Sequence, residues 1–144
     1  MRYWDSSALV PLLITESATG AMEALLAADA AVVTWWGSPV ECASAIARRG
    51  RDDPDAGVGI TTASMKLAAL EADWSEVSPS ERLRALARRL LRVHDLRAVD
   101  ALQLAAGLAA LDTRTEPLPF VTLDDRLALA ASREGFPILG LTER

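Results

Sequence analysis

The sequence predicts an α/β protein in which short strands alternate with helices and pair in a parallel sheet. Short apolar runs, such as residues 30–34, alternate with longer runs that have helical periodicity. Residues 83–91 place apolar side chains at i, i+3, i+4, i+7 and i+8, which is typical of an amphipathic helix. Strands that alternate with helices pair in parallel through right-handed crossovers. With 144 residues, of which 51% are apolar, we expect a single domain over residues 1–144.

The expected elements follow one another along the whole chain. Five short apolar runs are the expected strands: residues 2–5, 30–34, 74–77, 120–122 and 137–139, the last at an edge. The expected helices cover residues 6 to about 13, 17–28, 38–49, 60–73, 80–93, 98–111 and 125–134. Ser38 at the cap, Pro39 in the first turn and Glu41 at the third position predict where the third helix begins. A polar loop rich in helix breakers, residues 51–57, follows it, and residues 98–111 are apolar nearly all round, so that helix is expected at the centre.

Composition and charge argue against several classes of protein, namely disordered, membrane-spanning and secreted proteins. The apolar content argues against disorder, no run of about 18 uncharged apolar residues is present, and the N-terminus does not resemble a signal peptide. The single cysteine, Cys42, cannot form an internal disulfide, so we expect a cytoplasmic protein without membrane association. The net charge is −5, yet arginines gather in residues 48–51 and 82–92. These clusters are either solvated helix faces or an RNA-binding track, because arginine stacks on bases and grips phosphate.

Four acidic residues lie where a strand gives way to a helix, or in the first turn of a helix: Asp5, Glu41, Asp100 and Asp124. In a parallel sheet the carboxyl ends of the strands share one edge, and ligands bind there. We therefore expect these carboxylates to meet in one cleft. Such a cluster repels itself unless a cation occupies it, which indicates a divalent metal site.

Each acid also has an ordinary structural role open to it. Ser38 and Glu41 form a capping-box pattern, and Asp5 and Asp124 are placed to cap the helices that follow them. Asp100 fits such a role least, because it lies in an otherwise apolar segment where burial of an unpartnered carboxylate is unfavourable. The joint placement of the four acids, more than any one of them, favours the metal site.

Four motifs resemble those of PIN-domain proteins, in the same order and with fitting spacing over essentially the whole chain. They are residues 3–10 (YWDSSALV), Glu41 with Ala45 and residues 47–49 (ARR), residues 96–105 (LRAVDALQLA) and residues 121–127 (VTLDDRL). The nearest subgroup is that of the VapC-type toxins of type II toxin–antitoxin operons. Gln103 departs from the histidine that is common at its position. That histidine is not a core ligand in the family, so the departure is expected to affect packing or substrate preference and to leave catalysis in place.

The resemblance implies a three-layer α/β/α PIN-like domain whose central parallel sheet of four or five short strands gathers the acids around Mg²⁺ or Mn²⁺. The implied activity is that of a metal-dependent endoribonuclease. It would act on RNA as the toxin component held in check by a small cognate antitoxin, and family members usually form homodimers. The alternatives are a non-catalytic PIN-fold interaction module and a PIN nuclease of RNA processing that is not paired with an antitoxin.

The residues suit metal-dependent hydrolysis of phosphodiester bonds. Mg²⁺ prefers oxygen ligands and keeps several waters, so a few carboxylates and a substrate phosphate suit it. We expect Asp5 and Asp100 to be the principal metal ligands, directly or through water. Glu41 and Asp124 complete the set of candidate catalytic residues. They are expected to contact the metal through water, and one of them to orient the attacking water. The T-x-D pattern favours Asp124 over the adjacent Asp125.

Two hydroxyl residues are candidates for contacts that support the site. Ser7 and Thr122 are placed to donate hydrogen bonds to the acids, and their alternative roles are a helix cap and a strand-end contact. The tryptophans are expected in the core or at an interface, and an exposed Trp35 or Trp36 would favour a protein partner.

Other classes of site lack the residues that they require. A phosphoaspartyl enzyme of the haloacid-dehalogenase type would have a second aspartate two residues after Asp5, where Ser7 stands. A receiver domain would need a lysine at a strand end, whereas the only lysine, Lys66, lies in an expected helix. Neither glycine-rich phosphate-loop pattern occurs, and one histidine with one cysteine argues against a structural zinc site.

Overall fold

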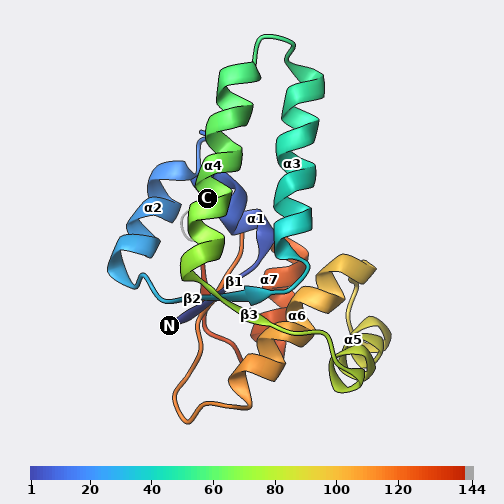
Figure 1. The fold of residues 1–144 in the computed structure, drawn as a ribbon. Coiled ribbons are helices and arrows are strands. Elements are labelled where there is room, and N and C mark those ends of the chain that lie inside the picture. Colours follow the sequence, from blue (N-terminus) through green and yellow to red (C-terminus); the bar gives the residue numbers. More distant parts are fainter. Residues whose placement is uncertain (142–144) are drawn as a thin grey trace.

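Within residues 1–141, five parallel strands form one sheet in the order β3-β2-β1-β4-β5 (Figure 1). The computed structural model describes residues 1–141, so the last three residues of the predicted domain lie outside the described part. The strands are β1 (Arg2–Trp4), β2 (Val32–Trp35), β3 (Ser75–Val77), β4 (Phe120–Val121) and β5 (Ile138–Leu139). The predicted α/β class and parallel pairing are confirmed, with β5 at an edge as expected.

In the described part of the chain, seven helices connect and cover the strands. They are α1 (Ser6–Leu9), α2 (Thr19–Ala28), α3 (Ser38–Asp52), α4 (Gly57–Asp73), α5 (Glu81–Val93), α6 (Ala98–Leu111) and α7 (Asp125–Arg133), with a 3₁₀ turn, η1 (Val10–Leu12), after α1. The helix over residues 98–111 has the predicted bounds. The helical run predicted from residue 6 to about 13 is divided, because Pro11 has no backbone N–H to continue an α-helix.

The sheet separates two apolar cores, which makes three layers. Tyr3 and Trp4 are adjacent on β1 and point to opposite faces, as neighbouring strand residues must. Tyr3 packs with buried residues of α5, α6 and α7, such as Leu104 of α6. Trp4 packs with buried residues of α1 to α4, such as Cys42 of α3. The helices therefore lie on both sides of the sheet, as Figure 1 shows.

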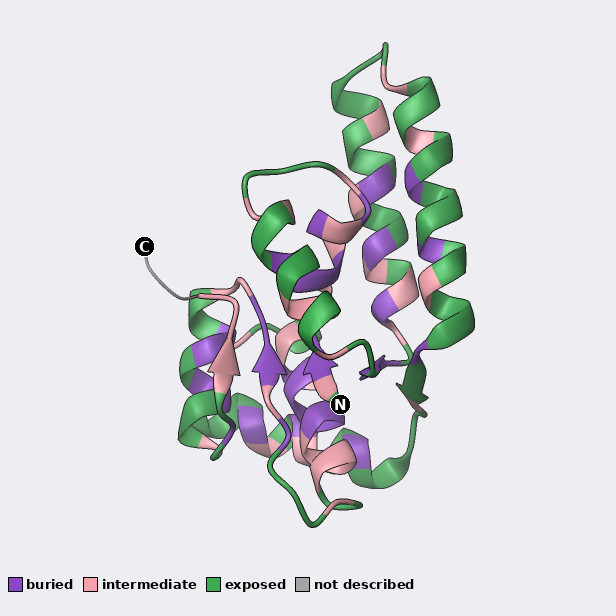
Figure 2. Ribbon diagram, turned by 90° about the vertical axis from the view of Figure 1, so that its left-hand side faces the viewer, coloured by how far each residue is buried: buried purple, intermediate pink, exposed green. Residues whose placement is uncertain are grey.

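Helices α3 and α4 form a long hairpin that projects away from the sheet (Figure 1). Its outer half is mostly exposed, and its buried residues lie toward the sheet (Figure 2). The expected end of α3 near Arg49 and the expected start of α4 at Ile60 are wrong: α3 continues to Asp52 and α4 begins at Gly57. The two helices pack on each other, with Ile60 close to Gly50, so helical structure extends through Gly50 and begins again at Gly57. Residues 53–56, which include Pro54, remain the turn between them.

Within residues 1–141, no helix has both the length and the apolar character needed to cross a bilayer.

Candidate functional site

The four acids reach the carboxyl edge of the sheet, around its topological switch point. From β1 the chain builds outward through β2 to β3 and then crosses over to β4 and β5, so the order reverses between β1 and β4. Asp5 directly follows β1, and Asp124 comes three residues after β4. Glu41 lies in the first turn of α3 and Asp100 in the first turn of α6. A switch point at this edge is where open α/β sheets bind ligands.

Asp5 is a buried carboxylate, only 2% exposed. It is the N-cap of α1: its Oδ1 accepts from the backbone N–H of Ser7, and its Oδ2 accepts from the Ser7 hydroxyl over 2.9 Å. Burial raises the pKa of Asp5 to about 7; hydrogen bonds from Thr122 and Ser7 oppose this, and the charge of Glu41 adds to it. Asp5 therefore both caps α1 and carries a buried carboxyl group with a raised pKa.

Glu41 is held by neutral donors on both of its oxygens. Oε1 accepts from the Ser6 hydroxyl over 2.9 Å, and Oε2 accepts from the Gln103 amide over 2.8 Å. Burial raises the pKa of Glu41, the two hydrogen bonds lower it, and the charge of Asp100 raises it further. No cation neutralises this carboxylate through a salt bridge in the described part of the chain.

Asp100 and Asp124 both also serve as helix-end acceptors. Asp100 Oδ2 accepts from the backbone N–H of Arg97 over 3.2 Å, and Asp124 Oδ1 accepts from that of Leu127 over 3.0 Å. Burial raises the pKa of Asp100, and the charge of Asp124 adds to this effect, whereas the Arg97 N–H bond and the charges of Arg97 and Arg126 lower it. Asp100 is only half-buried and accepts a backbone hydrogen bond at the start of α6, a role that the sequence favoured least for this acid.

Ser7 and Thr122 join the ends of the two central strands. Their hydroxyl oxygens lie 3.3 Å apart. The Ser7 hydroxyl accepts from the backbone N–H of Leu123 over 2.9 Å, and Thr122 Oγ1 accepts from that of Asp124 over 3.1 Å. The Ser7 hydroxyl also donates to Asp5 Oδ2, and Thr122 lies close enough to Asp5 to lower its pKa. The strand-end contacts, which were the alternative role of these hydroxyls, are therefore present together with the bond from Ser7 to Asp5.

The predicted capping box at Ser38 is wrong. Gly37 is the N-cap of α3, and no side chain caps that end. Ser38 is buried, and its hydroxyl instead contacts Thr34 and Gln103. Glu41 makes its bonds to Ser6 and Gln103, on α1 and α6, instead of turning back to its own helix. The side chains of Ser38 and Glu41 therefore form hydrogen bonds to other elements of the fold and do not cap α3.

The four acids form a chain of electrostatic neighbours, not a compact set of ligands. The charge of Glu41 raises the pKa of Asp5, that of Asp100 raises the pKa of Glu41, and that of Asp124 raises the pKa of Asp100. Among residues 1–141, no three His, Cys, Asp or Glu side chains are arranged as a ready-made metal site. In the same residues none of the four acids forms a salt bridge with a basic side chain. The structure thus brings the acids to one region and leaves their repulsion without an ion-pair partner.

The donor chemistry of these residues suits a hard divalent cation, because all four offer carboxylate oxygens. Three of the carboxyl groups have raised pKa values because of burial and mutual repulsion. A bound cation would relieve both effects. Mg²⁺ is commonly held by one or two carboxylates while water and substrate phosphate complete its coordination. The arrangement therefore needs no third protein ligand at the same ion.

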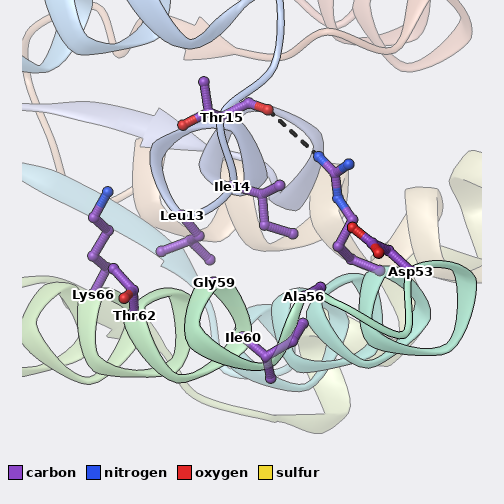
Figure 3. Close-up of a pocket in the computed structure, with 10 residues that line it drawn as sticks. Leu13, Ile14, Thr15, Asp53, Ala56, Gly59, Ile60, Thr62 and Lys66 are labelled. Atoms are coloured by element: carbon purple, nitrogen blue, oxygen red, sulfur yellow. Dashed lines mark hydrogen bonds between the residues drawn. The ribbon is translucent and has the colours of Figure 1, made fainter.

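A hollow beside the hairpin is separate from the acids. It has a volume of about 360 Å³ and lies between the segment at Leu13–Thr15 and helices α3 and α4 (Figure 3). A hydrogen bond of 3.4 Å from Arg49 to the Thr15 carbonyl closes one side. None of the four acids lines this hollow.

Sequence reasoning did not find several residues that hold the acids. Ser6, Tyr3 and Thr34 take part in the buried hydrogen bonds around Glu41 and Gln103. Ser6 carries a weak signal, since it follows Asp5 directly. Tyr3 and Thr34 lie in strands, where a polar group is ordinarily explained by packing, so nothing in the sequence pointed to this role.

The fold and the site define an α/β protein with a parallel five-stranded sheet and an acidic carboxyl edge. No protein-family model matches the chain, and a search of curated proteins found no significant match.

Proposed function

We propose that this protein is a metal-dependent endoribonuclease that hydrolyses RNA phosphodiester bonds. The observation that carries the proposal is the set of acids at the switch point, of which three have raised pKa values and none has an ion-pair partner in the described residues. Carboxylates kept in mutual repulsion favour a cation as their partner. The strand order and the four sequence motifs are consistent with a PIN-like domain.

In this proposal, Asp5 and Asp100 hold Mg²⁺ or Mn²⁺, directly or through water. Bound there, the ion would lower the pKa of a water and offset charge on the phosphate. Glu41 and Asp124 complete the acidic set, and one of them orients the attacking water. Ser7 and Thr122 hold the Asp5 carboxylate and keep the ends of β1 and β4 together.

The direct test replaces the two proposed ligands one at a time. Asp5→Asn and Asp100→Asn are expected to abolish cleavage of a mixed RNA substrate in Mg²⁺ or Mn²⁺ and to weaken Mn²⁺ binding measured by calorimetry. Removing metal with EDTA is expected to abolish wild-type cleavage, and added Mn²⁺ to restore it. Asp55→Asn, in the exposed loop between α3 and α4, is the matched control and is expected to keep full activity. Full cleavage by both site variants would refute the assignment.

We further propose that the enzyme is the toxin half of a toxin–antitoxin pair and forms a homodimer. This step is supported by the resemblance of the motifs to VapC-type toxins. Trp36, which is 57% exposed, is an aromatic anchor available to a protein partner. Induced expression is expected to arrest growth, and coexpression of a short adjacent upstream gene to restore it. Light scattering would measure the mass of the protein alone and with that partner.

Two alternatives predict different results. A non-catalytic interaction module would neither bind Mn²⁺ nor cleave RNA. A PIN nuclease of RNA processing would cleave RNA in the same metal-dependent way but would have no antitoxin. Coexpression of the upstream gene would then not change the effect of its expression on growth.

A further inference from the structure

The amide of Gln103 lies in the middle of a buried hydrogen-bond network beside the acids. Gln103 belongs to α6 and is 1% exposed. Its Oε1 accepts from the Tyr3 hydroxyl over 2.6 Å. Its Nε2 donates to Ser38 Oγ over 3.0 Å and to Glu41 Oε2 over 2.8 Å. Both amide hydrogens and the carbonyl oxygen therefore have partners from β1 and α3.

The direction of each hydrogen bond in this network follows from counting protons. Thr34 donates its only hydroxyl proton to the Trp4 carbonyl over 2.7 Å. In the 2.6 Å contact between Thr34 and Ser38, Ser38 must therefore be the donor. Ser38 then has no proton left to give to Gln103 and can only accept. A carboxylate also accepts only, so both neighbours require the NH₂ group of Gln103 on their side.

Tyr3 secures the same orientation from the other end. Its hydroxyl donates to Oε1 of Gln103 from the fully buried end of a side chain on β1. If the amide were turned by 180°, Oε1 would face the Glu41 carboxylate and Ser38 would lose the hydrogen bond that it accepts. Because an unpaired buried polar group is unfavourable, the turned amide is strongly disfavoured.

From these contacts we propose that Gln103 is a positioning residue for Glu41, with Tyr3 holding the Gln103 amide so that one N–H points at Oε2. The role rests on the proposed function, because it matters for the reaction only if Glu41 takes part in it. Gln103 acts through Glu41 and does not itself touch the reacting atoms.

The neutral character of the amide suits this role. Ser6 holds Oε1 and Gln103 holds Oε2, so the carboxylate is fixed at both oxygens by groups without charge. An arginine or lysine in place of Gln103 would fix Glu41 equally well but would neutralise it, which would weaken the attraction for a cation. Each carboxylate oxygen also has a second lone-pair site that remains for a water or an ion.

The test removes the donors and leaves the volume nearly unchanged. Gln103→Leu is expected to lower kcat for RNA by about 10-fold to 100-fold, as loss of an orienting partner commonly does, while KM for RNA stays the same. The Mn²⁺ dissociation constant is expected to rise by about 10-fold. Gln103→His, which can offer a ring N–H to Glu41, is expected to recover most of the lost kcat. If Gln103→Leu does not fold, Gln103→Met serves as the second donor-free variant.

A double-mutant cycle separates positioning from general weakening of the fold. Tyr3→Phe is expected to lower kcat in the wild-type background and to have no further effect on kcat in the Gln103→Leu background. Leu104→Val, the next residue on α6 and fully buried, is the control: it is expected to lower the free energy of unfolding without changing kcat. An equal effect of Tyr3→Phe in both backgrounds, or wild-type kcat and Mn²⁺ affinity in Gln103→Leu, would overturn the inference.

Crystal structures of the wild type and of Gln103→Leu give a readout that does not depend on activity. A displaced Glu41 carboxylate in the variant would support the inference, and an unmoved one would overturn it. If the wild-type protein neither cleaves RNA nor binds Mn²⁺, the proposed function fails, and the position of the carboxylate still decides whether Gln103 orients it.

Discussion

The hydroxyl of Ser6 donates to Oε1 of Glu41 over 2.9 Å and so joins the first turn of α1 to the first turn of α3. The two residues are 35 positions apart in the chain. Asp5, the N-cap of α1, directly precedes Ser6. One short helix therefore carries one candidate ligand and holds a second acid in place.

The Ser6 bond predicts a selective loss of activity. Ser6→Ala is expected to lower kcat for RNA by about 10-fold, because Glu41 then keeps only its bond to Gln103. Ser6→Thr retains the hydroxyl and is expected to retain most of the activity. Initial rates on a labelled RNA in Mn²⁺ measure both, with Ser44→Ala on the exposed side of α3 as the control. An unchanged kcat in Ser6→Ala would show that this bond does not serve the reaction.

The raised pKa of Asp5 predicts that the metal-free protein loses stability as pH rises. The folded-state pKa of Asp5, about 7, lies above the ordinary aspartate value of 3.8, so the folded state retains its proton over a range where the unfolded state has lost it. The contribution of Asp5 is therefore complete below about pH 4 and is lost progressively up to about pH 7. Asp5→Asn removes this loss and is expected to be more stable than the wild type at pH 8 by about 2–4 kcal/mol.

Urea unfolding of metal-free protein at pH 5, 7 and 9 measures this difference. The gap between wild type and Asp5→Asn is expected to widen from pH 5 to pH 7 and to change little from pH 7 to pH 9. Added Mg²⁺ is expected to stabilise the wild type at pH 8 and to leave Asp5→Asn unaffected, because a ligand that binds only the folded state raises its stability. A variant that is less stable than the wild type at pH 8 without metal would contradict the prediction.

A second ionic cluster, which includes none of the four acids, predicts that stability depends on pH in the opposite direction. Glu134, at the end of α7, accepts from Arg89 over 2.9 Å and contacts His94 Nε2 over 2.7 Å. The Arg89 hydrogen bond, followed by that of His94, lowers the pKa of Glu134 below its usual value. Its contribution to stability is thus present above the unfolded pKa of about 4.5 and is lost as pH falls through the lower folded value.

Glu134→Gln is expected to lower the free energy of unfolding at pH 7 by about 1 kcal/mol, because Arg89 is partly exposed and the pair is screened by solvent. The difference from the wild type is expected to shrink below about pH 4, which denaturant unfolding across pH would measure. Glu81→Gln, in the exposed pair with Arg84, is the control and is expected to change stability by less than about 0.5 kcal/mol. A gap that persists at pH 3 would contradict the ionic explanation.

Close packing of α6 on β4 predicts that Gly107 cannot be enlarged. A Cβ at Gly107 would lie 2.9 Å from Cε2 of Phe120, a buried ring that also contacts Phe136. Gly107→Ala is therefore expected to lower the free energy of unfolding by about 1–2 kcal/mol, although alanine favours the helix. Gly59→Ala in α4, where a Cβ meets nothing within 4 Å, is the matched control and is expected to raise it by about 0.5 kcal/mol. Thermal unfolding of the two variants would show opposite shifts in Tm, and equal shifts would refute the packing argument.

Periodicity was enough to predict most of the fold. The amphipathic pattern of α5 and the apolar character of α6 predicted both helices. A helix that buries one face or all faces needs apolar residues in every turn, and these are visible in the sequence. Alternation of strands and helices led to the parallel sheet, since crossover connections leave few other arrangements. The boundaries of α3 and α4 were missed, because the two helices pack on each other and stay helical through Gly50 and from Gly57, which no local pattern records.

The sequence by itself determined the class of fold and which acids follow the strands, since both depend on patterns within a few neighbouring residues. Only the tertiary structure decided how those acids are held. The partners of Glu41 are Ser6 and Gln103, which lie 35 and 62 positions away, and that of Gln103 is Tyr3, 100 positions away. Hydrogen bonds between remote residues form only when packing of the sheet and helices brings the groups within about 3 Å, and no spacing along the chain encodes that distance.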